Sequence, residues 1–170
     1  PQGRDVSATS QVMLHVTAAI TYQIFSGNLN LYDFTILFPA VIGSLTTIVI
    51  FGLVRLFGGT IAGLFASLFF AISLPILLRG TVGWFKSEPL GIFYGLIGLY
   101  LFLSGIHSKN KKIAFLKIIL AGVTMTFSMA SWGGNYFFNI VLGLFILALP
   151  FIRKDHKFLV YSIPLFVGSF

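Results

Sequence analysis

The sequence predicts an all-α membrane protein, a polytopic bundle of transmembrane helices. Hydrophobic residues make up 57% of its 170 residues and charged residues only 9%, whereas soluble domains carry roughly 25% charged residues. Long apolar stretches recur along the whole chain. Because a helix of about 20 apolar residues crosses a hydrocarbon core of roughly 30 Å, these stretches are long enough to span a membrane.

Residues 1–31 are predicted to form an external loop that contains a short interfacial helix. Val12–Phe25 fits a helix, but it carries several polar side chains, His15 among them. At about 1.5 Å per residue this helix would be only about 21 Å long, which is short for a membrane span. Because the chain starts at Pro1 without an initiator Met and stops at Phe170 inside an apolar run, we expect it to be an excerpt of a longer protein.

Residues 32–170 are predicted to form the transmembrane helical domain, with about five full spans and a truncated sixth. Short connections such as Gly58-Gly59 should make successive helices antiparallel neighbours. Small residues inside spans let helices approach closely, and Gly91, Gly95 and Gly98 lie near one helix face, which indicates a packing seam. The full spans are expected at residues 32–54, 60–78, 90–106, 113–131 and 135–152, and the sixth begins at Phe158.

Lysine and arginine are unevenly distributed between the two sets of connections, and this asymmetry predicts the orientation. The more basic set is assigned to the cytoplasm, so that residues 1–31, 79–89 and 132–134 share the external face. The net charge of +7 follows from this topology and from anionic lipid headgroups, so no nucleic-acid partner is expected. The basic set holds Arg55, Lys109, Lys111, Lys112, Arg153, Lys154 and Lys157.

The most informative polar segment is residues 79–89, a break between two apolar runs. It contains Arg79, Lys86 and Glu88, and Glu88 is the only glutamate of the chain. A carboxylate beside membrane spans suits three tasks: binding a hard divalent cation such as Mg²⁺ or Mn²⁺, acting as a general base, or pairing with Arg79 or Lys86. An exposed pair of this kind is worth only about 0–1 kcal/mol. The residues alone leave these interpretations open.

Four other side chains are weaker candidates for a site. His15 is either a packed or interfacial histidine or a functional group, and Arg4 with Asp5 forms either a loop ion pair or part of a substrate-facing loop. Trp132 is typical of an interfacial anchor, and the Gly133-Gly134 pair that follows predicts a tight reversal.

Three motifs resemble segments of oligosaccharyltransferase catalytic subunits. The segment from Arg79 to Glu88 (Arg-Gly-Thr-Val-Gly-Trp-Phe-Lys-Ser-Glu) resembles their second external loop, in which an Arg, small residues, a Gly and two bulky residues precede an Asp-x-Asp or Asp-x-Glu pair. Residues 131–137 are similar to the family's Trp-Gly-Gly-Tyr segment, and residues 1–4 to its first-loop Pro-x-Gly-Arg. The motifs follow the family order on the predicted external face. They look most like the archaeal branch, because Glu-Pro-Leu-Gly follows the second motif at residues 88–91.

The resemblance implies a glycosyltransferase with a C-type membrane core. Such an enzyme moves an oligosaccharide from a polyprenyl phosphate or diphosphate carrier, a lipid-linked oligosaccharide, to an acceptor asparagine of a protein or peptide. It implies a multi-pass protein of the cell membrane with its active face outside. It also implies a divalent cation, Mn²⁺ or Mg²⁺, held by acids of the first and second external loops.

The resemblance also implies roles for individual residues. Glu88 matches the second acid of the second-loop pair and is the expected catalytic and metal-binding residue. Lys86 stands where the family's first acid usually lies, so either Glu88 acts with acids of other segments or Lys86 turns a positive charge toward lipid phosphate. Arg79, Lys86 and Arg4 are the expected substrate-binding residues. The first-loop acidic pair is expected upstream of the chain and the soluble acceptor-recognition domain downstream; Asp5, His15 and Trp132 are further candidates.

Three alternatives remain at this point. One is another polyprenyl-phosphate-dependent glycosyltransferase with the same kind of core, which the first-loop motif would distinguish. A second is a transporter in which Lys86 and Glu88 line a path; against it, the predicted spans are nearly free of ionisable groups, which transport paths usually place at mid-membrane. The third is a non-catalytic membrane scaffold.

Overall fold

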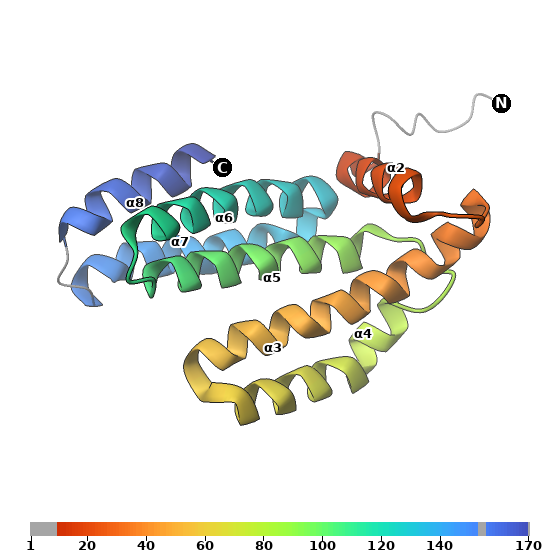
Figure 1. Cartoon of the computed structure of the whole chain (residues 1–170), viewed down its shortest axis with the longest axis horizontal. Helices are drawn as coiled ribbons and strands as arrows, with labels where there is room; N and C mark the ends of the chain where they lie inside the picture. The colour runs from red at the N-terminus through yellow and green to blue at the C-terminus, as the bar shows by residue number, and fades with distance from the viewer. Residues whose placement is uncertain (1–9, 153–155, 170) are drawn as a thin grey trace.

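The computed structural model of the protein describes residues 10–152 and 156–169, and within them it is helical with no strand (Figure 1). This confirms the predicted all-α class. Within these described residues, four helices are long and apolar enough to cross a membrane: α3, α5, α6 and Gly133–Ile152. In chain order the helices are α2 (Val12–Phe25), α3 (Leu31–Ile72), α4 (Leu74–Arg79), α5 (Ser87–Ile106), α6 (Lys111–Ser131), the 3₁₀ turn η1 (Gly133–Asn135), α7 (Tyr136–Ile152) and α8 (His156–Ser169).

Helix α3 is a helical hairpin rather than one straight helix. Gly59 has φ +76° and ψ −176° inside it, a conformation that side-chain-bearing residues rarely adopt. The outgoing arm, residues 31–58, therefore reverses into the return arm, residues 60–72 (Figure 1). A Cβ at Gly63 would lie 2.9 Å from the carbonyl oxygen of Phe51, so the two arms touch. The predicted connection at Gly58-Gly59 is confirmed.

The second predicted span, residues 60–78, is not a single helix. The return arm of α3 ends at Ile72, Ser73 is extended with ψ 129°, and α4 begins at Leu74. Pro75 explains the break, because proline lacks an N–H and its ring clashes with the carbonyl four residues earlier, that of Ala71. The count of five full spans stays a prediction, as do the truncated sixth span and the C-type core.

Helices α5 and α6 pack closely through the predicted glycine seam. A Cβ at Gly95 would lie 2.9 Å from the ring of Phe138 and 3.0 Å from the hydroxyl of Ser128, and one at Gly98 would lie 2.9 Å from Met125 Cγ. Each glycine thus removes an atom that would force the helices apart. The interpretation of this face as a packing seam is confirmed, and its neighbours are α6 and α7.

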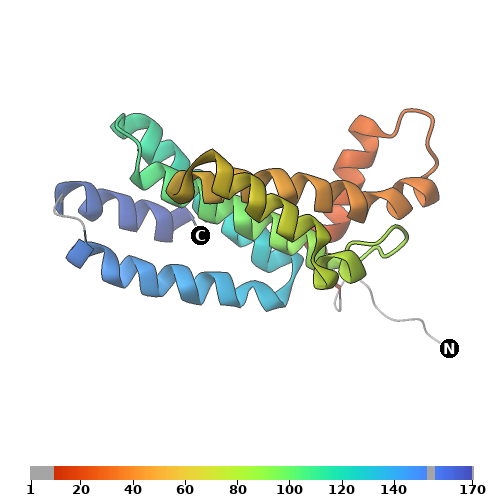
Figure 2. The same ribbon diagram turned by 90° about the horizontal axis from the view of Figure 1, so that it is seen from below.

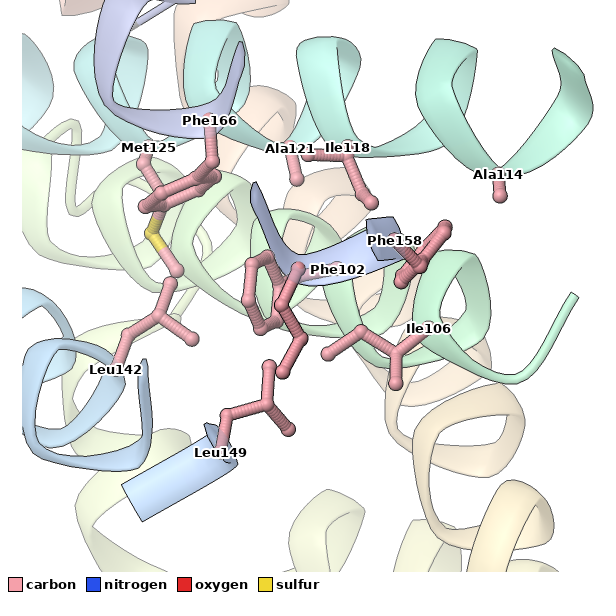
Figure 3. Packing of buried hydrophobic residues seen from close by; sticks show 11 residues of the cluster. Phe102, Ile106, Ala114, Ile118, Ala121, Met125, Leu142, Leu149, Phe158 and Phe166 are labelled. Carbon is pink, nitrogen blue, oxygen red and sulfur yellow. The ribbon is translucent and has the colours of Figure 1, made fainter. Parts of the chain in front are cut away.

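The larger of two buried apolar clusters joins α5, α6, α7 and α8 (Figure 3). Ala114, Ile118, Ala121 and Met125 of α6 have no exposed surface, and Phe102 meets Phe166 edge to face with ring centroids 5.0 Å apart. The smaller cluster joins α2, α3 and the start of α5 and consists of Leu14, Ala18, Phe38, Ile42 and Leu90. Since lipid is as apolar as these side chains, close packing rather than water exclusion holds the helices together.

The two ends of the bundle differ in charge. One, called here the loop end, carries α2, residues 80–86 and η1; the other, the basic end, carries the α3 reversal and residues 107–110 (Figures 1 and 2). Arg55, Lys109, Lys111 and Lys112 lie at or near the basic end, as the predicted topology requires. Helix α2 has the predicted bounds and lies across the loop end (Figure 2). Its place at a membrane surface and its external side stay predictions.

Candidate active site at the loop end

The backbone at the start of α5 positions Glu88. Lys86 is the extended N-cap residue with φ −129° and ψ 160°, and Glu88 lies in the first helical turn. Pro89 is tolerated there because N–H groups of the first turn have no intrahelical acceptor. The positive end of the helix dipole favours a carboxylate at this position. Helix α5 therefore begins three residues earlier than the predicted Leu90.

The Glu88 carboxylate uses its two oxygens differently. Oε1 accepts a hydrogen bond from Arg79 Nη1 at 3.0 Å, an ion pair between the end of α4 and the start of α5. Oε2 is buried and has no hydrogen-bond partner among residues 10–152 and 156–169. The Arg79 side chain is 60% exposed and that of Glu88 only 17%. The pair itself is worth little in so open a position, whereas a buried carboxylate oxygen without a partner is costly.

The loop between α4 and α5 is held by backbone hydrogen bonds, and the ammonium of its Lys86 contacts Trp84. Gly83, at φ +86°, donates its N–H to the carbonyl of Ile36 on α3 at 2.9 Å. The Lys86 ammonium lies 5.3 Å from the centroid of the Trp84 ring, a cation–π contact. Of the two ion pairs that the sequence left open for Glu88, the structure contains the one with Arg79.

Phe85 connects this loop to α2 and α3. Its ring lies 5.6 Å from that of Phe38 and 6.4 Å from that of His15, measured between centroids. His15 therefore lies beside the loop, and its side chain is exposed. The structure therefore brings His15 to the same end as Glu88, while its function stays a prediction.

Residues of α6 and η1 hold the first turns of α5 in place. Ser128 Oγ donates a hydrogen bond of 2.9 Å to the carbonyl of Gly91, and Asn135 Nδ2 donates one of 3.0 Å to the carbonyl of Ser128. Asn135 is 1% exposed, and its Oδ1 is buried without a partner in the described part of the chain. A Cβ at Gly91 would lie 2.7 Å from Trp132 Cβ. Trp132 thus abuts α5 one turn after Glu88.

Sequence reasoning missed Ser128 and Asn135. The available signal was an asparagine in an otherwise apolar stretch directly after Trp132-Gly133-Gly134, since a buried amide requires partners. The predicted tight reversal at Gly133-Gly134 is present as η1. A Cβ at Gly134 would overlap the Trp132 indole, so this glycine lets the ring fold back over the turn.

The residues present fit a divalent cation in part. Glu88 Oε2 is a hard oxygen donor without a partner, which Mg²⁺ and Mn²⁺ prefer. Residues 10–152 and 156–169 contain no group of three or more His, Asp, Glu or Cys side chains that would complete a site. Arg4 and Asp5 lie outside the described residues. Further ligands would have to come from beyond the part of the chain that the structure describes.

Fold and site together define a polytopic helical membrane protein. At one end of its bundle lies a carboxylate of which one oxygen is paired with an arginine. The family model described as oligosaccharyl transferase STT3, N-terminal, matches residues 1–168. The chain therefore belongs to the STT3 oligosaccharyltransferase family, and the resemblance seen in its three motifs is confirmed at that level.

Curated relatives agree with the family match. The chain is 29% identical over 172 residues to the dolichyl-diphosphooligosaccharide–protein glycosyltransferase subunit STT3B of Arabidopsis thaliana, covering 99% of this chain and 22% of the relative. It is 29% identical over 153 residues to the subunit of the same name in rice, covering 88% and 20%, and 26% identical over 171 residues to subunit stt-3 of Caenorhabditis elegans, covering 99% and 21%. The chain spans about a fifth of the length of these relatives.

Proposed function

We propose that this chain is the membrane-embedded part of a catalytic subunit that transfers an oligosaccharide from a polyprenyl phosphate or diphosphate carrier to an acceptor asparagine. The observation that carries the proposal is the Glu88 carboxylate, in a chain of this family, with one oxygen paired to Arg79 and the other buried and free of partners. The names of the relatives describe transfer from a dolichyl-diphosphooligosaccharide to protein.

We further propose that Glu88 Oε2 is a ligand of a divalent cation, Mn²⁺ or Mg²⁺. When bound, such a cation supplies Lewis-acid and template chemistry for the acceptor amide. The Arg79 guanidinium holds Oε1 and so limits rotation of the carboxylate. Acids of other segments, Asp5 among the candidates, would complete the ligand set.

Two exposed cations are proposed to bind the carrier phosphates. Arg79 keeps most of its surface open while it pairs with Glu88, and a guanidinium offers further N–H donors suited to phosphate oxygens. Lys86 is exposed and is not paired to Glu88, which supports a role toward phosphate in place of the family acid. Arg4 is proposed to act with them, and His15 and Trp132 are further candidates at the same end of the bundle.

We also propose that the chain is part of a multi-pass protein of the cell membrane and that its loop end faces outside. We assign it to the archaeal branch of the family. Glu-Pro-Leu-Gly at residues 88–91 supports the branch. The collection of lysine and arginine at the basic end supports the orientation. The three relatives described above are from plants and a nematode, so the archaeal branch is argued from this motif alone.

Glu88→Gln in the full-length protein tests the function. Gln still accepts the hydrogen bond of Arg79 but removes the charge that a hard cation requires. We expect transfer to an acceptor peptide to fall about 10²–10³-fold, by analogy with the loss of one transition-state contact, with partial rescue at high Mn²⁺. Binding of Mn²⁺, followed by electron paramagnetic resonance, should weaken in parallel.

Asp33→Asn is the matched control. It removes an exposed carboxylate from the first turn of α3, at the same end of the bundle, and should leave transfer and Mn²⁺ binding near normal. Near-normal turnover by a folded Glu88→Gln protein would reduce Glu88 to a loop ion pair and overturn the proposal.

A further inference from the structure

A groove of about 820 Å³ lies between α3 and α5 toward the basic end. In the view of Figure 1 the outgoing arm of α3 diverges from α5 toward the reversal of the α3 hairpin. The groove is lined mainly by apolar side chains of both helices, including Ile48, Leu56, Ile97 and Leu101. Only two of its lining side chains, Arg55 and Tyr100, carry polar groups. An apolar groove that also contains one cation and one hydroxyl is suited to bind an amphiphilic molecule.

Arg55 is exposed and has no acidic partner in the part of the chain that the structure describes. Its guanidinium carbon lies 5.8 Å from the centroid of the Phe51 ring, which orients the group along the groove wall. Among residues 10–152 and 156–169, no carboxylate lies within ion-pair distance of Arg55. A guanidinium offers several N–H donors in a geometry that matches phosphate, so the site is suited to an anion.

Gly52 lets Tyr100 pack against the face of α3 that also carries Arg55. A Cβ at Gly52 would lie 3.4 Å from Tyr100 Cε2 and 3.8 Å from Cζ, so the phenol ring rests directly on the α3 backbone. Gly52 and Arg55 are three residues apart and share one face of the helix. The hydroxyl therefore lies at the turn that precedes Arg55, and it makes no hydrogen bond within the part of the chain that the structure describes.

We propose that this groove binds one anionic phospholipid from the leaflet at the basic end. Its phosphate pairs with Arg55, the Tyr100 hydroxyl donates to a phosphate or ester oxygen, and an acyl chain follows the apolar wall. From Ile48 to Leu56 this wall is about 12 Å long at about 1.5 Å per residue. Lys109, Lys111 and Lys112, at the same end, attract anionic headgroups to the surface. This binding is independent of the proposed transfer reaction.

A neighbouring groove offers an internal control. It has a volume of about 490 Å³ and lies between the same two helices, but its lining, which includes Leu53, Phe57, Leu99 and Leu103, contains no charged side chain. Acyl chains of neutral and anionic lipids should occupy it equally. Preference for an anionic headgroup should therefore appear only at the groove with Arg55.

The experiment uses the full-length protein in nanodiscs of phosphatidylcholine with a photoactivatable phosphatidylglycerol or phosphatidylcholine probe. Crosslinks are assigned to individual residues by tandem mass spectrometry and quantified, because lining residues of the two grooves alternate along the same helices. In the wild type we expect the phosphatidylglycerol probe to be enriched on the peptides of Ile48, Leu56 and Ile97. Arg55→Gln should lower the apparent affinity for this probe about fivefold, the effect of about one basic residue near a membrane surface.

Three further variants make the result specific. Arg55→Lys keeps the charge and should retain most of the preference, and Tyr100→Phe should lower it about threefold through loss of one hydrogen bond. Lys109→Gln weakens the attraction of anionic headgroups to the whole surface, so it should lower phosphatidylglycerol labelling at both grooves alike and leave the preference for the groove with Arg55 unchanged. Three outcomes would each overturn the proposal. Both lipids could crosslink equally at the groove, or Arg55→Gln could leave the affinity for the phosphatidylglycerol probe unchanged. The groove could also react with neither probe because another segment covers it.

Discussion

The hydroxyl of Ser128 donates a hydrogen bond to the carbonyl oxygen of Gly91, at 2.9 Å, and thereby ties α6 to α5 one turn after Glu88. Asn135 extends this link by donating to the carbonyl of Ser128. The Glu88 carboxylate is therefore positioned from two sides: Arg79 holds one of its oxygens, and the contact with α6 holds its helix. Any change that moves α5 away from η1 should act on the carboxylate as well.

Gly91→Ala should disturb this arrangement. The added Cβ would lie 2.7 Å from Trp132 Cβ and would overlap the Asn135 side chain, and overpacking of this kind costs about 1–3 kcal/mol. We expect a lower thermal unfolding midpoint and a lower rate of transfer. Gly143→Ala is the control, because a Cβ there meets nothing within 4 Å and alanine favours the helix. Equal behaviour of the two variants would show that the contact at Gly91 is unimportant.

Gly59→Ala should destabilise the α3 hairpin. The φ of +76° with ψ of −176° is a region that is essentially restricted to glycine, and its occupation by another residue costs about 1–3 kcal/mol. The matched control is Gly43→Ala in the outgoing arm, where a Cβ has open space. Thermal unfolding of both variants in detergent measures the difference. If Gly59→Ala unfolds at the wild-type midpoint, the reversal does not depend on this backbone conformation.

The sequence predicted the features that depend on local chemistry. The spacing of Gly91, Gly95 and Gly98 predicted a packing seam, because residues without side chains on one helix face can only serve close approach. The reversal at Gly58-Gly59 was predicted because these two residues form a short connection between two apolar runs. The break at Ser73 was not predicted although Pro75 indicates it, because the apolar run continues through the proline.

The partners of the candidate site depend on the path of the chain and could not be predicted. Whether Glu88 pairs with Arg79 or Lys86 is decided by the loop between them, and a hydrogen bond from Gly83 to Ile36, far away in the sequence, holds that loop. The link from Ser128 to Gly91 likewise joins residues of two helices. Neither contact is accompanied by a periodicity or a motif in the sequence from which it could have been predicted.

Lys86→Ala should weaken binding of the lipid-linked donor more than it affects the chemical step. Its ammonium lies over Trp84 rather than at the Glu88 carboxylate, so its removal leaves the pair of Glu88 with Arg79 intact. Loss of one charged contact to phosphate predicts a KM for the donor raised about tenfold, with kcat nearly unchanged. Lys86→Arg should restore most of the affinity. A fall in kcat alone would instead place Lys86 in the chemical step.

The two ends of the bundle should face opposite sides of the membrane. Thr81 is exposed in the loop that precedes Glu88, and Asn110 is exposed in the connection at the basic end. Because the described chain has no cysteine, single Thr81→Cys and Asn110→Cys substitutions, in a full-length protein without other cysteines, report each end separately. An impermeant maleimide applied to intact cells should label Thr81→Cys, whereas Asn110→Cys should react only after the membrane is permeabilised. Labelling of Asn110→Cys alone in intact cells would invert the topology and place Glu88 on the cytoplasmic side.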